Sequence, residues 1–183
     1  MPDGYLPVLG RIGMVIWLNG AFGSGKSSVA EAINKRIHKS FVYDPEQVGY
    51  FLWDNFPDEL KRKGNFQHMD IWREFNYKIL KHIDSYYDGV IIIPMTIYIM
   101  QYYDEIIGRL INDGVAVNHF ILFATKQTII SRLVQRGDDA DGWEAQHIDI
   151  CINAFETDIS GDKIDTEHKT VDEIASDIIS RTH

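Results

Sequence analysis

Cysteine is nearly absent from the sequence, and long apolar runs are missing. The 183 residues contain one cysteine, Cys151, which excludes an internal disulfide and suits a reducing compartment. Its isoleucine neighbours predict a buried thiol rather than a nucleophile. The longest apolar run, residues 90–100, is too short to span a bilayer. The first residues are not followed by the apolar region that a signal peptide contains. We therefore expect a cytoplasmic protein.

Positive charge is also scarce. Lysine and arginine number 18 against 27 aspartates and glutamates, which gives a formal net charge of −9. Because an acidic surface repels DNA and RNA, we expect no nucleic-acid polymer among the partners. Any site for phosphate groups must then be a local basic site on an acidic protein.

Residues 20–27, GAFGSGKS, fit the phosphate-binding pattern G-x-x-x-x-G-K-[ST] without a mismatch. An apolar run at residues 14–19 predicts a buried strand before it, and residues 28–38 show helical spacing after it. In this context Lys26 reaches the β- and γ-phosphates, and the Ser27 hydroxyl binds Mg²⁺. The expected cofactors are therefore ATP and Mg²⁺, although the choice between adenine and guanine stays open. The expected nucleotide-binding residues are Gly20, Ala21, Phe22, Gly23, Ser24, Gly25, Lys26, Ser27 and Ser28.

Asp44 follows a short predicted strand at residues 40–43 and allows two compatible interpretations. It can cap a helix that begins at Pro45. It can also point into the ligand crevice, where it would accept a hydroxyl proton or help to hold Mg²⁺. The apolar run at residues 89–93 has no Asp or Glu after it, which leaves Asp44 as the expected carboxylate near the metal and argues against a motor-type ATPase.

Residues 45–86 are dense in aromatic side chains and are expected to form the acceptor-side helices. These rings either pack the core or line an acceptor pocket with apolar walls. Arg73 lies off the predicted apolar stripe of this region, which suits either a surface arginine or an anion-binding one. Thr96 follows another predicted strand at the edge where ligands bind. The predicted acceptor contacts are Asp44, Trp72, Arg73 and Thr96.

Arg132 and Arg136 lie four residues apart on a predicted helix, 126–136, whose expected core stripe includes Val134. Like charges at this spacing repel, and a triphosphate between them would relieve the repulsion; the alternative is two solvated arginines. The polar residues 137–147 suit a mobile lid. Asp165 and Thr166 follow the last predicted strand, and we place both beside the nucleotide.

Five predicted strands alternate with helices, which indicates an α/β protein with a parallel sheet. The plan is similar to that of small P-loop kinases such as the shikimate, gluconate and nucleoside monophosphate kinases. That similarity implies a three-layer fold with strand order 2-3-1-4-5. We expect one domain at residues 14–183, after a non-essential arm at residues 1–13 that carries two prolines and three glycines.

Several stretches resemble the bacterial tunicamycin resistance proteins. They are IWLNGAFGSGK at residues 16–26, VYDPE at 42–46, WR at 72–73, FNY at 75–77, PMT at 94–96 and EIIGRL at 105–110. The resemblance implies an ATP-binding protein that protects cells against tunicamycin, a uridine-containing antibiotic with a lipid tail. Some members carry an amphipathic C-terminal extension tied to membranes, and since this sequence has none we expect no stable membrane anchor.

Three functions follow from these observations. The first is a phosphotransferase in which Lys26, Asp44, Arg132 and Arg136 move the γ-phosphoryl of ATP to a small acceptor. The second is a protein that uses ATP to bind and sequester a drug without modifying it. The third is a nucleoside monophosphate kinase acting on UMP or CMP. The partner in each case is a small molecule, and the choice between monomer and homodimer stays open.

Overall fold

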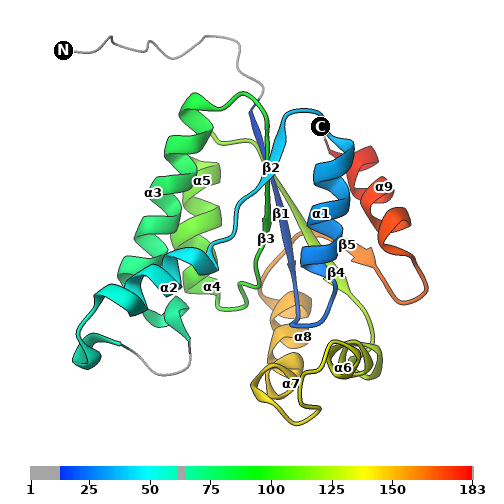
Figure 1. The fold of residues 1–183 in the computed structure, drawn as a ribbon. Helices are drawn as coiled ribbons and strands as arrows, with labels where there is room; N and C mark the ends of the chain where they lie inside the picture. The colour runs from blue at the N-terminus through cyan, green and yellow to red at the C-terminus, as the bar shows by residue number, and fades with distance from the viewer. Residues whose placement is uncertain (1–12, 62–64, 183) are drawn as a thin grey trace, which may run out of the picture.

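The computed structural model describes residues 13–61 and 65–182, and within them five strands form one parallel sheet (Figure 1). The strand order is β2-β3-β1-β4-β5, which confirms the predicted fold class and topology. The strands are β1 Met14–Gly20, β2 Ser40–Val42, β3 Val90–Pro94, β4 Val117–Phe123 and β5 Asp162–Asp165. The predicted arm at residues 1–13 lies almost wholly outside the described residues.

Helices connect the strands in the order that the alternating pattern predicts. They are α1 Lys26–Arg36, α2 Glu46–Asn55, α3 Asp70–Tyr86, α4 Met100–Tyr103, α5 Arg109–Asn112, α6 Lys126–Gln135, α7 Trp143–Gln146, α8 Ile148–Thr157 and α9 Val171–Arg181. Short 3₁₀ turns lie at Asp58–Leu60 and Phe66–His68, and a π-helical turn at Asp104–Gly108. No helix in the described part of the chain is long and apolar enough to cross a membrane.

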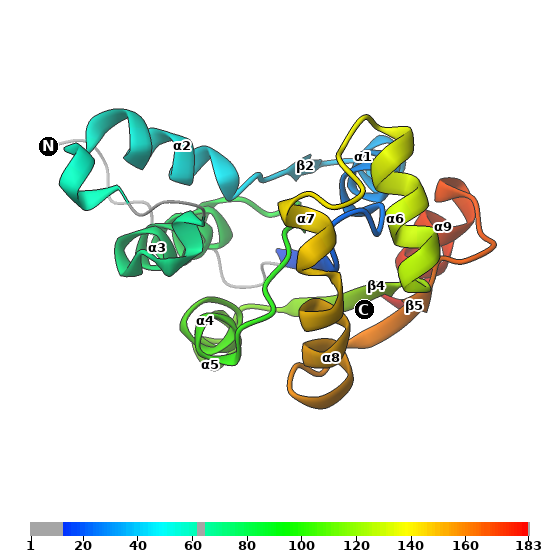
Figure 2. The same cartoon turned by 90° about the horizontal axis from the view of Figure 1, so that it is seen from below.

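The central strand β1 is buried on both faces, and its side chains alternate between two cores. Val15 and Trp17 pack with residues of α3 and α5, while Ile16 and Leu18 pack with α1 and α9. A third core lies between β4, α6 and α8. Figures 1 and 2 show α1 beside α9, and α3 beside α4 and α5, on opposite sides of the sheet.

Several local predictions differ from the structure. Residues 100–112 form one continuous helical stretch, in which a π-helical turn separates α4 from α5 and changes which side chains face inward. Val134, expected in the core, is 50% exposed. Arg73, expected off the apolar stripe, is buried with 6% of its surface exposed. The prediction for Cys151 is confirmed, because its side chain is fully buried.

A buried amide at the end of β1 fixes the point where the phosphate loop begins. The Asn19 Oδ1 atom accepts hydrogen bonds from the backbone N–H groups of Gly20 and Ile97, both at 2.9 Å. Its Nδ2 atom donates to the Ile97 carbonyl at 2.9 Å and lies 3.2 Å from Nε2 of His119. Since Nδ2 is a donor, Nε2 of His119 must accept, and Nδ1 then donates to the Ser160 carbonyl at 2.9 Å. The network therefore requires a neutral imidazole.

We expect His119 to make stability depend on pH. Burial lowers the pKa of His119 to about 4, below its ordinary value of 6.5. Between these values the unfolded chain binds a proton that the folded chain does not, so the free energy of unfolding should fall as the pH drops from 6.5 to 4, by about 2–3 kcal/mol. Urea unfolding at several pH values measures this loss.

The His119→Gln variant should lose much less stability over the same pH range, because glutamine at this position cannot bind a proton. His38→Gln, at an exposed position, is the matched control and should keep the wild-type dependence. An unchanged slope in His119→Gln would contradict the assignment.

Candidate functional site

The loop between β1 and α1 has the backbone conformation that its glycines allow. Gly20, Gly23 and Gly25 have φ angles of 139°, 84° and 97°, in the region that side chains disfavour. A Cβ atom at Gly20 would lie 2.4 Å from the Leu122 carbonyl oxygen, so only glycine fits between β1 and β4. Gly25 caps α1, and the next residues, Lys26 and Ser27, form its first turn. The loop thus joins a helix N-terminus, which favours bound anions.

The Lys26 side chain folds back over the phosphate loop that precedes it in the chain. Its Nζ atom donates to the carbonyl oxygens of Gly20 at 3.0 Å and Ala21 at 2.8 Å, and to the Ser24 hydroxyl at 3.4 Å. Burial lowers the pKa of Lys26 to about 8, and the positive charge of Arg136 acts in the same direction. An anion beside this ammonium would replace weak neutral acceptors with a full negative charge.

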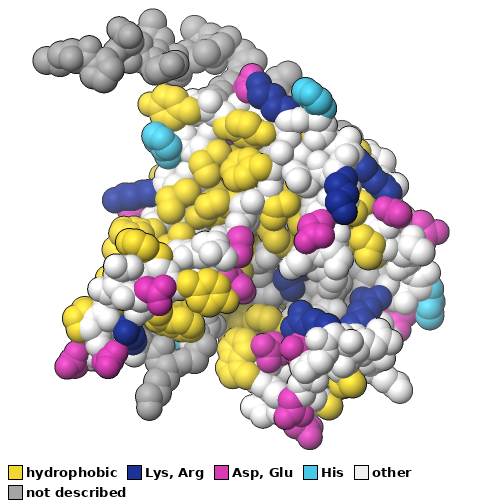
Figure 3. All heavy atoms as spheres, viewed as in Figure 1, with side chains coloured by type: hydrophobic (Ala, Val, Ile, Leu, Met, Phe, Trp, Pro, Cys, Tyr) yellow, Lys and Arg dark blue, Asp and Glu magenta, His cyan; other side chains and the backbone are white. Residues whose placement is uncertain are grey.

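A cavity of about 450 Å³ opens in front of the loop and brings together most of the predicted nucleotide-binding residues. Its walls include the loop, the start of α1, and both predicted arginines. The lining residues are Gly23, Ser24, Gly25, Lys26, Ser27, Ser28, Val29, Arg132, Arg136, Lys169, Thr170, Val171 and Ile174. Figure 3 shows Lys and Arg side chains gathered between the lower end of α1 and α6, on a surface that carries acidic groups elsewhere. The predicted basic site is therefore local.

Arg132 in α6 and Arg136, the residue that follows this helix, are each held by a partner near the cavity. Arg132 donates from Nη1 to the Thr166 hydroxyl at 3.0 Å and from Nη2 to the Thr166 carbonyl at 2.6 Å. The Thr166 hydroxyl in turn donates to the Phe123 carbonyl at 3.0 Å, which ties the arginine to the end of β4. Arg136 forms an ion pair with Asp138. Thr166 thus lies behind Arg132 and positions it.

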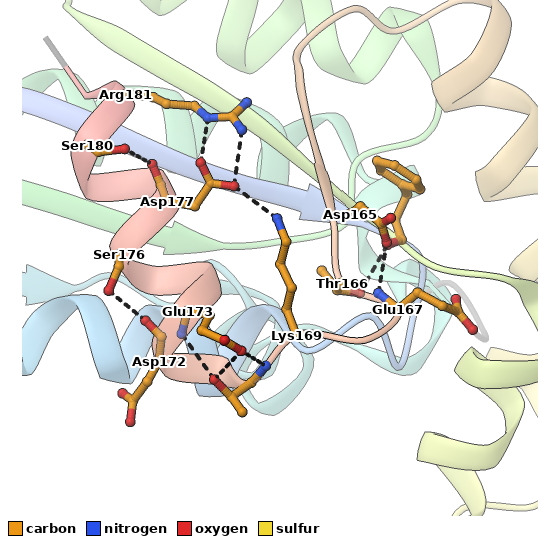
Figure 4. Close-up of polar contacts among 12 residues, drawn as sticks. Asp165, Thr166, Glu167, Lys169, Asp172, Glu173, Ser176, Asp177, Ser180 and Arg181 are labelled. Atoms are coloured by element: carbon orange, nitrogen blue, oxygen red, sulfur yellow. Dashed lines mark hydrogen bonds and ion pairs between the residues drawn. The ribbon is translucent and has the colours of Figure 1, made fainter.

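Figure 4 shows the segment after β5 and its polar contacts. The Asp165 carboxylate is exposed and accepts a hydrogen bond from the backbone N–H of Glu167 at 2.8 Å, and Asp165 does not line the cavity. Lys169 and Thr170, which sequence reasoning missed, do line it. The Lys169 ammonium lies 3.2 Å from Asp177 on α9. Thr170 forms a capping box with Glu173 at the start of α9, a pattern that predicts the beginning of a helix but not a cavity wall.

Two carboxylates lie where β2 passes into α2. Asp44 accepts from the backbone N–H of Glu46 through Oδ1 and from the Gln47 side chain through Oδ2, both at 2.9 Å, so the capping interpretation describes its contacts. Glu46 was missed from the sequence. Burial and then the Asp44 charge raise the pKa of Glu46, while the Lys26 and Arg136 charges oppose this shift. Glu46 therefore faces the phosphate loop from α2.

The other predicted acceptor residues hold the walls of the site together. Trp72 is fully buried, and its indole N–H donates to the Pro45 carbonyl at 3.0 Å. The Thr96 hydroxyl donates to the Gly20 carbonyl at 2.8 Å. Contacts of these side chains with an acceptor stay predictions.

Arg73 is likewise engaged within the protein. Its Nε atom donates to Glu105 in the π-helical turn at 2.5 Å, and Nη1 donates to the Gln67 carbonyl at 2.6 Å. The guanidinium carbon also lies 4.3 Å from the centre of the Tyr102 ring. These contacts use two of the five N–H donors of Arg73, and anion binding by this side chain stays a prediction.

The predicted lid region, residues 137–147, contains α7 and touches the phosphate loop. The Trp143 ring meets the Phe22 ring edge-on with centres 5.0 Å apart, and His147 lies 4.1 Å behind it. The negative charge of Glu144 also raises the pKa of Glu46. An aromatic contact thus joins this region to the loop, while its movement as a lid stays a prediction.

The protein groups around the loop would supply only part of the ligands of a Mg²⁺ ion, and phosphate oxygens would supply the others. No group of three His, Cys, Asp or Glu side chains that could hold a metal occurs in residues 13–61 and 65–182. Ser27 is exposed and lines the cavity beside Lys26. Mg²⁺ commonly binds through one or two protein groups plus substrate phosphates and water, an arrangement that the Ser27 hydroxyl suits, and magnesium binding by Ser27 and Asp44 stays a prediction.

We expect the Lys26 pKa to make ATP affinity fall above pH 8. Below that pH the ammonium is charged before ATP arrives, whereas above it each binding event must take up a proton. Calorimetry in buffers of different ionisation enthalpy should show uptake approaching one proton at about pH 9 and little near pH 7. Equal proton uptake at both pH values would contradict this assignment.

We expect Thr166→Val to weaken ATP binding about threefold to tenfold, because Arg132 loses one of its two anchoring hydrogen bonds. Thr157→Val is the matched control, since that hydroxyl bonds only within α8, to the Asn153 carbonyl. Titration with ATP measures both. Unchanged affinity in Thr166→Val would show that Thr166 does not position Arg132.

Comparison with known proteins agrees with this geometry. The sequence model of the adenylylsulphate kinase family matches residues 12–118. Among solved structures, the tunicamycin resistance protein of Deinococcus radiodurans has a TM-score of 0.78 and 25% identity, over 92% of this chain and 95% of that chain. The predicted resemblance to the tunicamycin resistance proteins is thereby confirmed.

Two further structures share the fold at lower identity. A gluconokinase of Sinorhizobium meliloti 1021 has a TM-score of 0.63 and 13% identity, over 93% of this chain and 91% of that chain. The APS kinase of Mycobacterium tuberculosis, solved with AMPPNP and APS, has a TM-score of 0.56 and 16% identity, over 93% and 97%. No protein of curated function has a matching sequence. Because the family model covers more than half of its residues, this chain belongs to the adenylylsulphate kinase family of P-loop proteins.

Proposed function

We propose that this protein is a phosphotransferase that moves the γ-phosphoryl group of ATP to a hydroxyl of a small, nucleoside-like molecule. One observation carries the proposal: a single cavity collects most of the phosphate loop with Lys26, Arg132 and Arg136. The charges of Lys26 and Arg136 also act on the carboxylate of Glu46, which follows Asp44 closely in the chain and supports a place for an acceptor hydroxyl beside the phosphates.

The transfer follows from the positions of these groups. The acceptor oxygen attacks the γ-phosphorus, the bond from that phosphorus to the β–γ bridging oxygen breaks, and ADP leaves. The hydroxyl proton passes to the Asp44 carboxylate. Lys26, Arg132 and Arg136 stabilise the negative charge that spreads over the phosphoryl oxygens. Glu46 helps to orient the acceptor hydroxyl.

A magnesium ion, when bound with ATP, neutralises charge on the β- and γ-phosphates, and Ser27 with Asp44 would hold it. Asp44 already has one oxygen fixed by the Glu46 N–H and the other by Gln47. These hydrogen bonds keep the carboxylate in one orientation.

The family and the similar solved structures support this class of acceptor. The matched family and two of the described neighbours are kinases of small molecules by name, and the structure with 25% identity is that of a tunicamycin resistance protein. A nucleoside-like antibiotic or metabolite agrees with both. The aromatic residues between α2 and α3 would form the acceptor side of the site.

We expect Asp44→Asn to lower the rate of phosphoryl transfer by about two to four orders of magnitude while leaving ATP affinity within about threefold. Mass spectrometry of tunicamycin and a nucleotide panel after incubation with Mg-ATP measures the transfer, and calorimetry measures the affinity. The matched control is Asp54→Asn, an exposed carboxylate on α2, which should behave as the wild type.

Added phosphate on an acceptor, lost in Asp44→Asn, supports the phosphotransferase. Two results together would contradict it in favour of sequestration. The wild-type protein would bind ATP and tunicamycin but add phosphate to no acceptor, and the Asp44→Asn variant would still protect cells.

A further inference from the structure

A second cavity, of about 170 Å³, lies between α6, α8 and the strands β4 and β5. Its apolar wall includes Ile121 on β4, Ile129 on α6, and Ile152 and Phe155 on α8. Within the described part of the chain, none of the residues that line this cavity also lines the nucleotide cavity. A molecule bound here would therefore leave the nucleotide cavity open.

The size and lining of this cavity determine which chemical group fits it. An apolar cavity of about 150 Å³ can stay free of water and take up a molecule as large as benzene. The cavity beside α8 is of similar size, and its isoleucine and phenylalanine side chains offer an apolar surface. A branched alkyl group of the size of a leucine side chain is therefore a suitable occupant.

Two opposite charges lie at the edge of the cavity. Lys163 on β5 is paired in register with Ile121, so both side chains leave the sheet on the face that the cavity occupies. Glu156 comes four residues after Ile152 on α8 and so lies on the same side of that helix. Both charged side chains are exposed, and no ion pair joins these two described residues. The cation and the anion are thus available to a ligand.

A free amino acid with an apolar side chain matches this arrangement. Its side chain would fill the cavity, its carboxylate would lie near Lys163, and its ammonium group would lie near Glu156. An uncharged apolar molecule would use neither charge. A residue inside a peptide would also match less well, because its amide groups carry no charge. We propose that this cavity binds a free α-amino acid with a branched alkyl side chain, a site that goes beyond the proposed phosphotransferase.

The site lies directly behind the phosphate loop. Ala21 of the loop lines the cavity, and its carbonyl oxygen accepts a hydrogen bond from Lys26 Nζ at 2.8 Å. The helix α6 contributes Ile129 to this cavity and Arg132 to the nucleotide cavity. The two sites are therefore adjacent but separate, and a nucleotide analogue can distinguish them.

The first test compares side chains. Calorimetry titrates leucine, alanine and glutamine into the full chain, with and without AMPPNP. Leucine should bind at least about tenfold more tightly than the other two, because alanine leaves most of the cavity empty and glutamine brings a polar group into it. AMPPNP should change the leucine affinity by less than about threefold. No binding of leucine, equal affinity for all three amino acids, or loss of leucine binding with AMPPNP would overturn the inference.

The second test separates the two charges. Isopentylamine is leucine without its carboxylate, and 4-methylpentanoate is leucine without its ammonium group. Lys163→Gln should weaken binding of leucine and 4-methylpentanoate about twofold to fivefold and leave isopentylamine unaffected, whereas Glu156→Gln should weaken leucine and isopentylamine and spare 4-methylpentanoate. Glu59→Gln, at an exposed position in the 3₁₀ turn Asp58–Leu60, is the matched control and should change none of the three affinities.

The third test fills the cavity. Ala124 lines it and is 8% exposed, so Ala124→Leu places a branched alkyl group where the ligand would lie. This variant should lose at least about tenfold in leucine affinity, and thermal melting checks that it folds. The charge variants change exposed positions, so they test the site independently of core packing. Wild-type leucine affinity in Lys163→Gln and Glu156→Gln, or in a folded Ala124→Leu variant, would overturn the inference and leave the proposed phosphotransferase unaffected.

Discussion

The side-chain amide of Asn19 is the interaction on which the site depends. It binds the first amide of the phosphate loop and both backbone groups of Ile97, and it contacts His119 on β4. Three neighbouring strands are thus fixed relative to one another at the edge where ligands bind. Thr96 adds a second hydrogen bond to the Gly20 carbonyl. The loop is held on both sides of its first glycine, so its shape does not require a bound phosphate.

Positively charged side chains gather at one cavity in a protein that is acidic overall. The two arginines of α6 and the loop lysine share one cavity, and their mutual repulsion is a cost that a triphosphate would relieve. The Arg136 charge contributes to the low pKa of Lys26, and the Asp44 charge to the high pKa of Glu46. Perturbed cations and carboxylates facing one another are typical of catalytic sites. The folded protein therefore holds like charges close to one another at the place where ligands would bind.

The sequence predicted the sheet order, the phosphate loop and the two arginines, because glycine spacing and apolar periodicity are local signals. It failed where a side chain's environment depends on distant segments. Arg73 is buried because Glu105 reaches it from a π-helical turn, and no periodicity predicts such a turn. Lys169 and Thr170, which line the cavity, were missed, and the place of Asp165 beside the nucleotide stays a prediction. Glu46 was overlooked because its approach to Lys26 results from the packing of α2 against the sheet.

The central claim is that the preformed loop, with the arginines of α6, binds a triphosphate. Isothermal titration calorimetry of the unmodified protein with Mg-ATP tests it most directly. The account predicts saturable binding of one nucleotide per chain, weakened by rising salt because the contacts are ionic. Absence of binding, or binding that Lys26→Ala leaves unchanged, would contradict it.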